Sequence, residues 1–89
     1  MVLIINYALN NGLKDYNPLF NAIKGCGEWW HFMESTWIVN TVYSADVVGK
    51  HLQKYIDTNT DHLLVMRLQR ESQGWLPNEA WNWINSKQY

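Results

Sequence analysis

Cysteine is almost absent from this sequence, since Cys26 is the only one among 89 residues. A framework of disulfide bonds is therefore excluded, which fits a reducing compartment. Long apolar runs are missing as well, and none approaches the roughly 20 residues that a membrane-spanning helix requires. The opening MVLIINYALNN also lacks the basic leader and cleavage pattern of a signal peptide. These absences predict a cytoplasmic protein that does not associate with membranes.

Charge is scarce and nearly balanced, with 7 Lys and Arg against 8 Asp and Glu and a net charge of −1. No general attraction to nucleic acid follows from this, and the balance argues against binding of long duplex DNA. Any phosphate must therefore be bound by local geometry. Aromatic residues are abundant instead, with six Trp and five Tyr. Such side chains fill cores, line interfaces or stack on bases.

The spacing of apolar residues predicts a β-α-β-β-α-β order followed by a tail helix. The expected strands are 2–9, 29–34, 36–43 and 62–68, and the expected helices are 15–27, 44–56 and about 76–87. Asn17 is the expected N-cap of the first helix, ahead of Pro18 in its first turn, and Ser44 is that of the second. Gly25 and Gly27 should end the first helix.

This order predicts one α+β domain over residues 1–89, a ferredoxin-like βαββαβ sandwich with a short C-terminal helix. Two helices then cover one face of an antiparallel sheet. Strands 2–9 and 62–68, however, are apolar at both alternating sets of positions, so the second face needs a cover too. A second copy, packed sheet against sheet or edge to edge, is one solution. The tail helix, which carries Trp81 and Ile84 among its apolar residues, is the other.

The first strand runs into a polar loop that precedes a helix, a place where free amides and the helix dipole favour anions. Asn10, Asn11, Gly12 and Lys14 could cradle a phosphate there. The Asn-Gly pair is equally typical of a simple turn. Position 8, at the end of the strand, is alanine and can perform no acid–base or metal chemistry.

His31 is the most interesting residue of the aromatic segment WWHFME. Alternation along a strand predicts that His31 shares a face with Trp29 and Met33, and that Trp30 points to the other face. A histidine there can act as a base, a ligand or a stacking partner, or can be purely structural. The three histidines show no spacing typical of a zinc site.

Ser35 and Thr36 place two hydroxyls at the hinge between two strands, where they could donate to a phosphate or hold a bulge together. The carboxylates are scattered and show no pairing typical of acid–base catalysis. The tryptophans are expected in the core, and any that are exposed would form a stacking platform. The four considered for this role are Trp29, Trp30, Trp37 and Trp75.

Several of these segments resemble a known family of small bacterial proteins described as SinR-like. The segments that carry the resemblance are NYALN, DYNPLFNAIKGCGEWWHFMESTWIVNT, SADVV and TDHLLVMRL, within residues 3 to 68. The most specific block is WWHFMESTWIV. That family is similar in turn to the small CRISPR-associated adaptation nuclease, a dimeric ferredoxin-like protein. The resemblance therefore implies the same fold and a homodimer.

The resemblance also implies a metal site that this chain lacks. Family members read Tyr-Asp-Leu-Asn where this chain reads Tyr7-Ala8-Leu9-Asn10. In the adaptation nucleases, this aspartate from both subunits binds a divalent metal at the dimer axis, where the metal supports phosphodiester cleavage. A methyl group cannot bind Mg²⁺ or Mn²⁺, so we expect no metal or cofactor unless position 8 is Asp. Either the acid was lost naturally while the pocket was kept, or Asp was deliberately replaced.

The remaining family-like positions are intact and form the candidate site together with the loop. The catalytic candidates are position 8, occupied by Ala8, and His31. The ligand-binding candidates are Asn6, Tyr7, Asn10, Asn11, Lys14, Tyr16, Ser35, Thr36 and Trp37.

Three functions are consistent with this sequence. The first is a homodimer that binds a nucleotide or short RNA through its phosphodiester and thereby removes a signal in phage or mobile-element counter-defence. The second is a metal-dependent phosphodiesterase or endoribonuclease whose catalytic Asp is replaced by Ala8. The third is a protein-interaction module that uses the uncovered sheet face.

Overall fold

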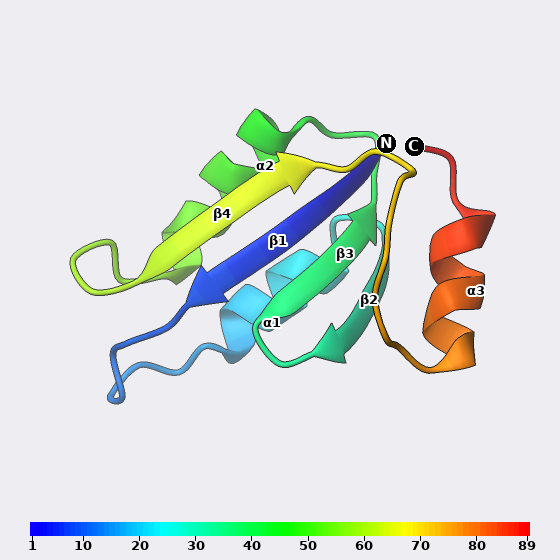
Figure 1. Ribbon diagram of the computed structural model, residues 1–89. Coiled ribbons are helices and arrows are strands. Elements are labelled where there is room, and N and C mark those ends of the chain that lie inside the picture. Colours follow the sequence, from blue (N-terminus) through cyan, green and yellow to red (C-terminus); the bar gives the residue numbers. More distant parts are fainter.

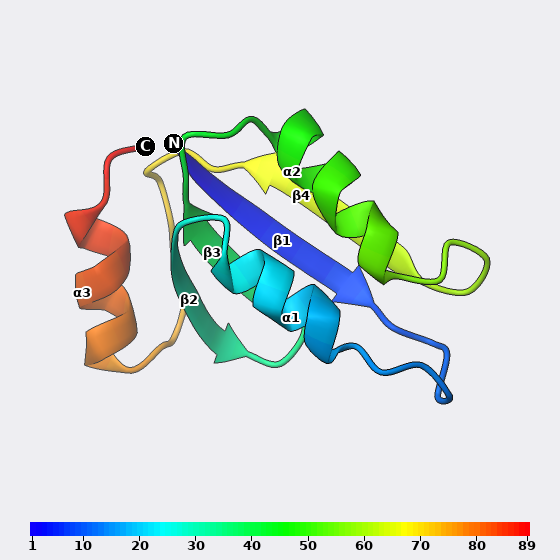
Figure 2. The ribbon, with the colours of Figure 1, turned by 180° about the vertical axis from the view of Figure 1, so that it is seen from behind.

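The backbone of the computed structural model, which describes residues 1–89, forms an antiparallel sheet with two helices against one face (Figures 1 and 2). The elements are β1 (Val2–Ala8), α1 (Asn17–Lys24), β2 (Glu28–Met33), β3 (Thr36–Asn40), α2 (Ala45–Leu52), the 3₁₀ turn η1 (Gln53–Tyr55), β4 (His62–Arg67) and α3 (Asn78–Ser86). No helix is long and apolar enough to cross a lipid bilayer.

The strands lie in the order β2-β3-β1-β4, and every neighbouring pair is antiparallel. This confirms the predicted α+β class and is compatible with a ferredoxin-like sandwich. The strand predicted at 36–43 ends earlier, at Asn40. The chain bends there, and the Thr41 hydroxyl accepts a hydrogen bond from the backbone N–H of Tyr43 at 3.2 Å. A side chain that bonds to a nearby backbone group in this way competes with the strand ladder.

The helix ends test two predicted caps. Ser44 caps α2 as predicted, because its Oγ accepts the backbone N–H of Val47 at 3.2 Å. The Asn17 cap is wrong, because Asn17 is itself the first helical residue and Tyr16 is the cap position. The backbone N–H of Asn17 donates instead to Asp15 Oδ1 at 3.0 Å, so the acid two residues earlier satisfies this free donor.

The face of the sheet that α1 and α2 cover, called the helix face below, holds the larger core. Alternate residues of β1 point into it and meet the apolar stripes of both helices. Its buried members are Leu3, Ile5, Tyr7, Leu19, Ile23, Trp37, Val39, Val48 and Leu52.

The opposite face, called the open face, is covered only in part. Val2, Trp30 and Ile38 pack there against Ala80 and Ile84 of α3. The tail helix therefore covers the β2 side, as one of the two sequence-based alternatives predicts. Figure 1 shows α3 beside β2 and well away from β4. Leu64 and Met66 of β4 remain 54% and 53% exposed, so an apolar strip stays uncovered.

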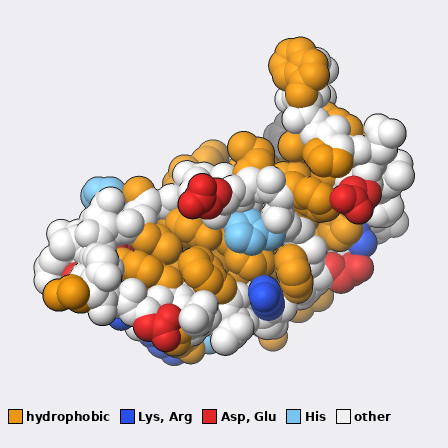
Figure 3. Space-filling model, turned by 90° about the horizontal axis from the view of Figure 1, so that it is seen from below, with side chains coloured by type: hydrophobic (Ala, Val, Ile, Leu, Met, Phe, Trp, Pro, Cys, Tyr) orange, Lys and Arg blue, Asp and Glu red, His pale blue; other side chains and the backbone are white.

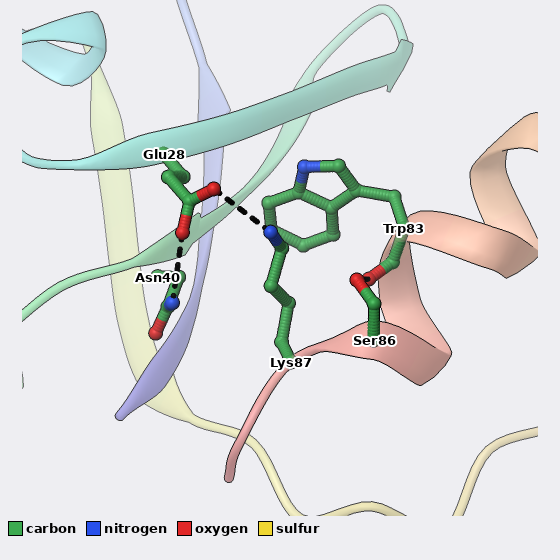
Figure 4. Close-up of polar contacts among 5 residues, drawn as sticks. All are labelled: Glu28, Asn40, Trp83, Ser86 and Lys87. Atoms are coloured by element: carbon green, nitrogen blue, oxygen red, sulfur yellow. Dashed lines mark hydrogen bonds and ion pairs between the residues drawn. The ribbon is translucent and has the colours of Figure 1, made fainter.

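Polar contacts fix the end of α3 against the sheet (Figure 4). Lys87 Nζ lies 2.9 Å from Glu28 Oε2 and 4.8 Å from the ring centroid of Trp83. Asn40 Nδ2 donates to the other oxygen of Glu28 at 3.2 Å, and Ser86 Oγ donates to the Trp83 carbonyl at 2.7 Å. The hydrogen bond from Lys87, followed by that from Asn40, lowers the pKa of the Glu28 carboxyl.

We expect Ile84→Ala to lower the free energy of unfolding by roughly 2–4 kcal/mol, because it leaves a cavity between α3 and the sheet. The 85% exposed Val42 offers a matched control, and Val42→Ala should change stability by less than about 0.5 kcal/mol. Urea denaturation of both variants measures the difference. Equal stabilities would show that α3 is not docked on the sheet.

Candidate functional site

The residues expected to form one site lie in three places. Some residues of the β2–β3 turn and the adjoining strand ends lie on the helix face, and others lie on the open face. The residues of the loop after β1 form a third, separate cluster. The division follows from strand alternation, because Tyr7 points to the helix face and its neighbours Asn6 and Ala8 point to the open face.

On the helix face, one hydrogen-bonded chain organises the β2–β3 turn. Trp37 Nε1 donates to the Tyr7 hydroxyl at 2.9 Å, and that hydroxyl donates to the Glu34 carbonyl at 3.2 Å. His31 Nε2 lies 3.0 Å from the same carbonyl, so this nitrogen carries the hydrogen. Burial raises the pKa of the Tyr7 hydroxyl further above its ordinary value of 10.0, so the hydroxyl is protonated at neutral pH and can donate. These hydrogen bonds connect the β2–β3 turn to β1 and β3.

The surface of this region is an aromatic platform made of Trp29, His31 and Trp37. The His31 ring lies flat on the Trp37 indole, with centroids 3.7 Å apart and an interplanar angle of 13°. The Trp29 ring is 5.4 Å from Trp37 and 43% exposed, and His31 is exposed. Lys24 Nζ lies 5.2 Å from the Trp29 ring centroid. Buried Trp37 thus supports two exposed rings with a cation beside them.

The view from below Figure 1 shows what surrounds this end of the molecule. Hydrophobic side chains gather over much of the face seen there, with a few charged side chains among them (Figure 3). Exposed apolar side chains that gather on one face are typical of a binding surface.

A bulge in β2 explains which part of the predicted alternation is right. Trp29 and His31 share the helix face as predicted, and Trp30 points to the open face. Met33 is wrong, because it lines the same open-face groove as Trp30. The pairing register shifts between Trp30 and Met33, and one extra residue in a strand reverses the alternation beyond it.

On the open face, Asn6 holds the strand end to the turn. Its Nδ2 donates to Thr36 Oγ1 at 2.6 Å and to the Ser35 carbonyl at 3.2 Å. Ala8 is exposed and stands opposite His62 in the β1–β4 pair. A shallow hollow of about 140 Å³ lies at this strand end, and its lining includes Ala8 and His62. Position 8 therefore faces away from the aromatic platform.

The loop after β1 is bound to the turn before β4. The backbone N–H of Asn10 donates to Asp61 Oδ1 at 2.7 Å, and the Tyr16 hydroxyl donates to Asp61 Oδ2 at 2.7 Å. Asn11 Nδ2 donates to Asp57 Oδ2 at 3.0 Å. Both carboxylates belong to the polar turn DTNTD, residues 57–61, and neither is among the site residues that the sequence predicts.

Asp61 dominates the electrostatics of this loop and is only 5% exposed. Burial alone raises its pKa, but hydrogen bonds outweigh burial. The donors, in order of effect, are the backbone N–H groups of Asn10 and Asp57 and the hydroxyls of Tyr16 and Thr60. Together they lower the pKa of Asp61 to about 2. Charged acceptors bind such donors strongly, so the amide of Asn10 is already occupied by an internal anion. Lys14 lies half-buried in the same loop.

A second aromatic surface lies on the open face beside α3. A groove of about 440 Å³ runs there between the sheet and the segment 72–76, with Trp30, Trp75 and Trp81 among its walls. Trp30 Nε1 is buried and has no hydrogen-bond partner, while Trp75 is 90% exposed. The groove has no basic residue in its lining. The aromatic platform is distinguished by its histidine and by Lys24.

The arrangement supports recognition more directly than catalysis. Exposed rings backed by a buried indole can stack on a flat ligand, and Lys24 can meet a negative charge next to it. No group of three or more His, Cys, Asp and Glu side chains lies close enough to hold a metal ion.

Comparison with known proteins places this chain in no family, because no protein-family model matches it and no curated protein sequence matches it.

We expect Asp61→Asn to destabilise the protein at pH 7, because one carboxylate oxygen becomes an NH2 group that cannot accept a hydrogen bond. The donors bound to both oxygens of Asp61 then compete for a single uncharged acceptor. The folded-state pKa of Asp61 is below the ordinary value of 3.8, so its stabilising effect is full above about pH 4 and is lost as the pH falls towards 2. Urea denaturation at several pH values should therefore show a smaller fall in stability between pH 4 and 2 in the variant. Parallel pH profiles would contradict this role.

Proposed function

We propose that this chain is a ferredoxin-like homodimer that binds nucleotides or short RNA by stacking a base on the aromatic platform. The observation that carries the proposal is the exposed His31 ring lying flat on buried Trp37, with Trp29 and Lys24 beside it. Base–aromatic stacking tolerates any base, because every base has a π-face. Lys24 supplies a positive charge for the adjoining phosphate.

The topology supports the ferredoxin-like assignment. β1 and β3 lie side by side at the centre, with β4 and β2 at the edges. Each of the two helices connects a central strand to an edge strand, which is the arrangement of two split βαβ units. The resemblance of segments within residues 3 to 68 to the SinR-like proteins favours the same fold.

The charge distribution favours a small ligand. The net charge is −1, and the platform has Lys24 as its cation. Affinity for long nucleic acid depends on many basic contacts to phosphates, which this surface does not offer. Only one or two basic contacts are needed by a small ligand, such as a mononucleotide, a cyclic dinucleotide or a few nucleotides of RNA. Holding such a signal without cleaving it would deplete it, which is the counter-defence role that we propose.

We expect Trp29→Ala and His31→Ala each to weaken nucleotide binding. Loss of one stacking ring costs roughly 1–3 kcal/mol, so the dissociation constant should rise roughly 5- to 150-fold. Fluorescence anisotropy with labelled cyclic dinucleotides and short oligoribonucleotides measures this change.

Trp75→Ala is the matched control, because it removes an exposed indole that lies outside the platform. It should leave the affinity unchanged. Equal losses in all three variants would show non-specific adsorption to aromatic surfaces, and a panel with no bound nucleotide would reject the proposal.

A second candidate function is a metal-dependent phosphodiesterase that requires Asp at position 8. Ala8 is exposed at the end of a central strand beside His62, so a carboxylate there would reach solvent and a bound ion. Ala8 lies on the open face and His31 on the helix face, so the two catalytic candidates of this function stand on opposite sides of the sheet. The reading rests on the family resemblance and on this accessibility.

We expect Ala8→Asp to leave the fold intact, because the new side chain points to solvent. If the second function holds, this variant cleaves RNA or a cyclic dinucleotide in the presence of Mn²⁺ and the parent chain does not. Chromatographic detection of products, with and without chelator, measures the gain. Ala8→Asn is the control, because it matches Asp in size and lacks its charge; cleavage by neither variant rejects the enzymatic reading.

A further inference from the structure

The outer strand β4 has an unprotected edge. β4 pairs with β1 on one side and has no strand on the other. Edge strands are commonly protected by a bulge, a proline or a charge that points inward. The opposite edge has such a device, because β2 carries a register shift. β4 reads HLLVMR, has no proline and pairs with β1 in unbroken register.

The hydrogen bonds of the sheet show which backbone groups of β4 are free. The backbone N–H of Leu68 donates to the Val2 carbonyl at 2.8 Å, so these two residues form a hydrogen-bonded pair. Such pairs alternate along an antiparallel ladder. The even-numbered residues of β4 therefore bond to β1. Leu63, Val65 and Arg67 direct their N–H and C=O groups away from the sheet.

A groove accompanies this free edge on the helix face. It measures about 440 Å³, and its walls are formed by α2 and by Leu63, Leu64 and Val65. The helix carries Gly49 at this point, where an added Cβ would contact Val65 at 3.9 Å, so α2 lies close to the strand. On the open face, Leu64 and Met66 form the uncovered apolar strip. The edge therefore has apolar surface on both sides of a row of free backbone groups.

We propose that β4 pairs with β4 of a second copy, antiparallel about a two-fold axis through Val65, to give a continuous eight-stranded sheet. A two-fold axis perpendicular to the sheet keeps the helix faces on one side. In this register, Val65 meets the partner's Val65 and Leu63 meets the partner's Arg67. Each of these pairs exchanges two hydrogen bonds. All three outward-directed residues of β4 are then satisfied.

The same register covers the apolar strip. Leu64 stands opposite the partner's Met66, and the pair recurs on the other side of the axis. These are non-hydrogen-bonded pairs, in which the Cα atoms approach to about 4.5 Å and side chains contact closely. The exposed apolar surface of β4 is thereby buried by its own sequence.

Charge on the groove favours a second copy over an unrelated peptide. Asp46 and Lys50 form an exposed ion pair at 3.1 Å on the α2 wall. The axis sets the two α2 helices antiparallel beside each other, so Lys50 of one copy faces the partner's Asp46. The surface is therefore complementary to itself, as an interface with two-fold symmetry requires.

This dimer differs from the one that the family resemblance implies. The two β1 strands are separated by both β4 strands, and the two residues at position 8, each opposite His62, lie on opposite sides of the axis. Three strand spacings of about 4.8 Å across the sheet and six residues of about 3.4 Å along it place them roughly 25 Å apart. They cannot share one metal ion. The inference rests on the strand edge and is independent of the proposed nucleotide ligand.

A charge-swap experiment tests the interface and its register. Leu64→Lys with Met66→Lys places like charges opposite each other on both sides of the axis, and should weaken dimerisation at least roughly 100-fold. Leu64→Glu with Met66→Lys places opposite charges there and should restore the dimer. Sedimentation equilibrium measures the three dissociation constants, and thermal melting checks that these exposed substitutions leave each protomer folded.

The control for backbone pairing is Val65→Pro, which removes a free N–H and leaves the ladder to β1 intact, and should give a monomer. A parent chain that remains monomeric at roughly 100 µM overturns the proposal. This concentration is on the order of the dissociation constant of a weak specific dimer. A dimer that survives both Val65→Pro and the double-lysine change also overturns it, because another face then forms the contact. Failure of the Glu/Lys pair to restore the dimer overturns the register.

Discussion

The hydrogen bond between the Trp37 indole and the Tyr7 hydroxyl, at 2.9 Å, is the contact on which this structure depends. It joins the two central strands on the helix face, and Tyr7 passes the connection on to the β2–β3 turn. Trp37 is almost completely buried, stacks with Phe20 of α1 and supports His31. One buried indole thus contacts both α1 and the exposed His31 ring. The base of the platform is therefore a residue of the main core.

A sheet that is apolar on both faces imposes the second constraint. Nine buried residues fill the helix face, whereas α3 reaches only the β2 side of the open face. Leu64 and Met66 of β4 therefore stay exposed on this face. The uncovered apolar strip and the free backbone edge therefore coincide on the same strand. Pairing with another strand satisfies both at once, which covering the face alone would not.

Much of the fold follows from the sequence because periodicity and caps are local signals. The element order, the Ser44 cap and the shared face of Trp29 and His31 needed only neighbouring residues. Met33 was placed wrongly because a bulge depends on how two strands pair, which alternation along one strand does not show. The role of Asp61 was missed for a similar reason, because its partners Asn10 and Tyr16 lie 51 and 45 residues away. Strand alternation, which is visible in the sequence, also places Tyr7 on one face of the sheet and Asn6 and Ala8 on the other. The candidate residues therefore do not form one site.

The location of the platform within the proposed dimer restricts the ligand. The platform lies on β2 at one edge of the sheet, whereas the dimer contact lies on β4 at the other. In an eight-stranded sheet the two β2 strands are seven spacings apart, which is roughly 34 Å at 4.8 Å per spacing. A mononucleotide or cyclic dinucleotide cannot bridge that distance, so two such ligands bind independently. Only an RNA long enough to span the sheet gains affinity from dimerisation, because its second contact becomes intramolecular. The dependence of affinity on RNA length therefore separates a small-molecule signal from an RNA ligand.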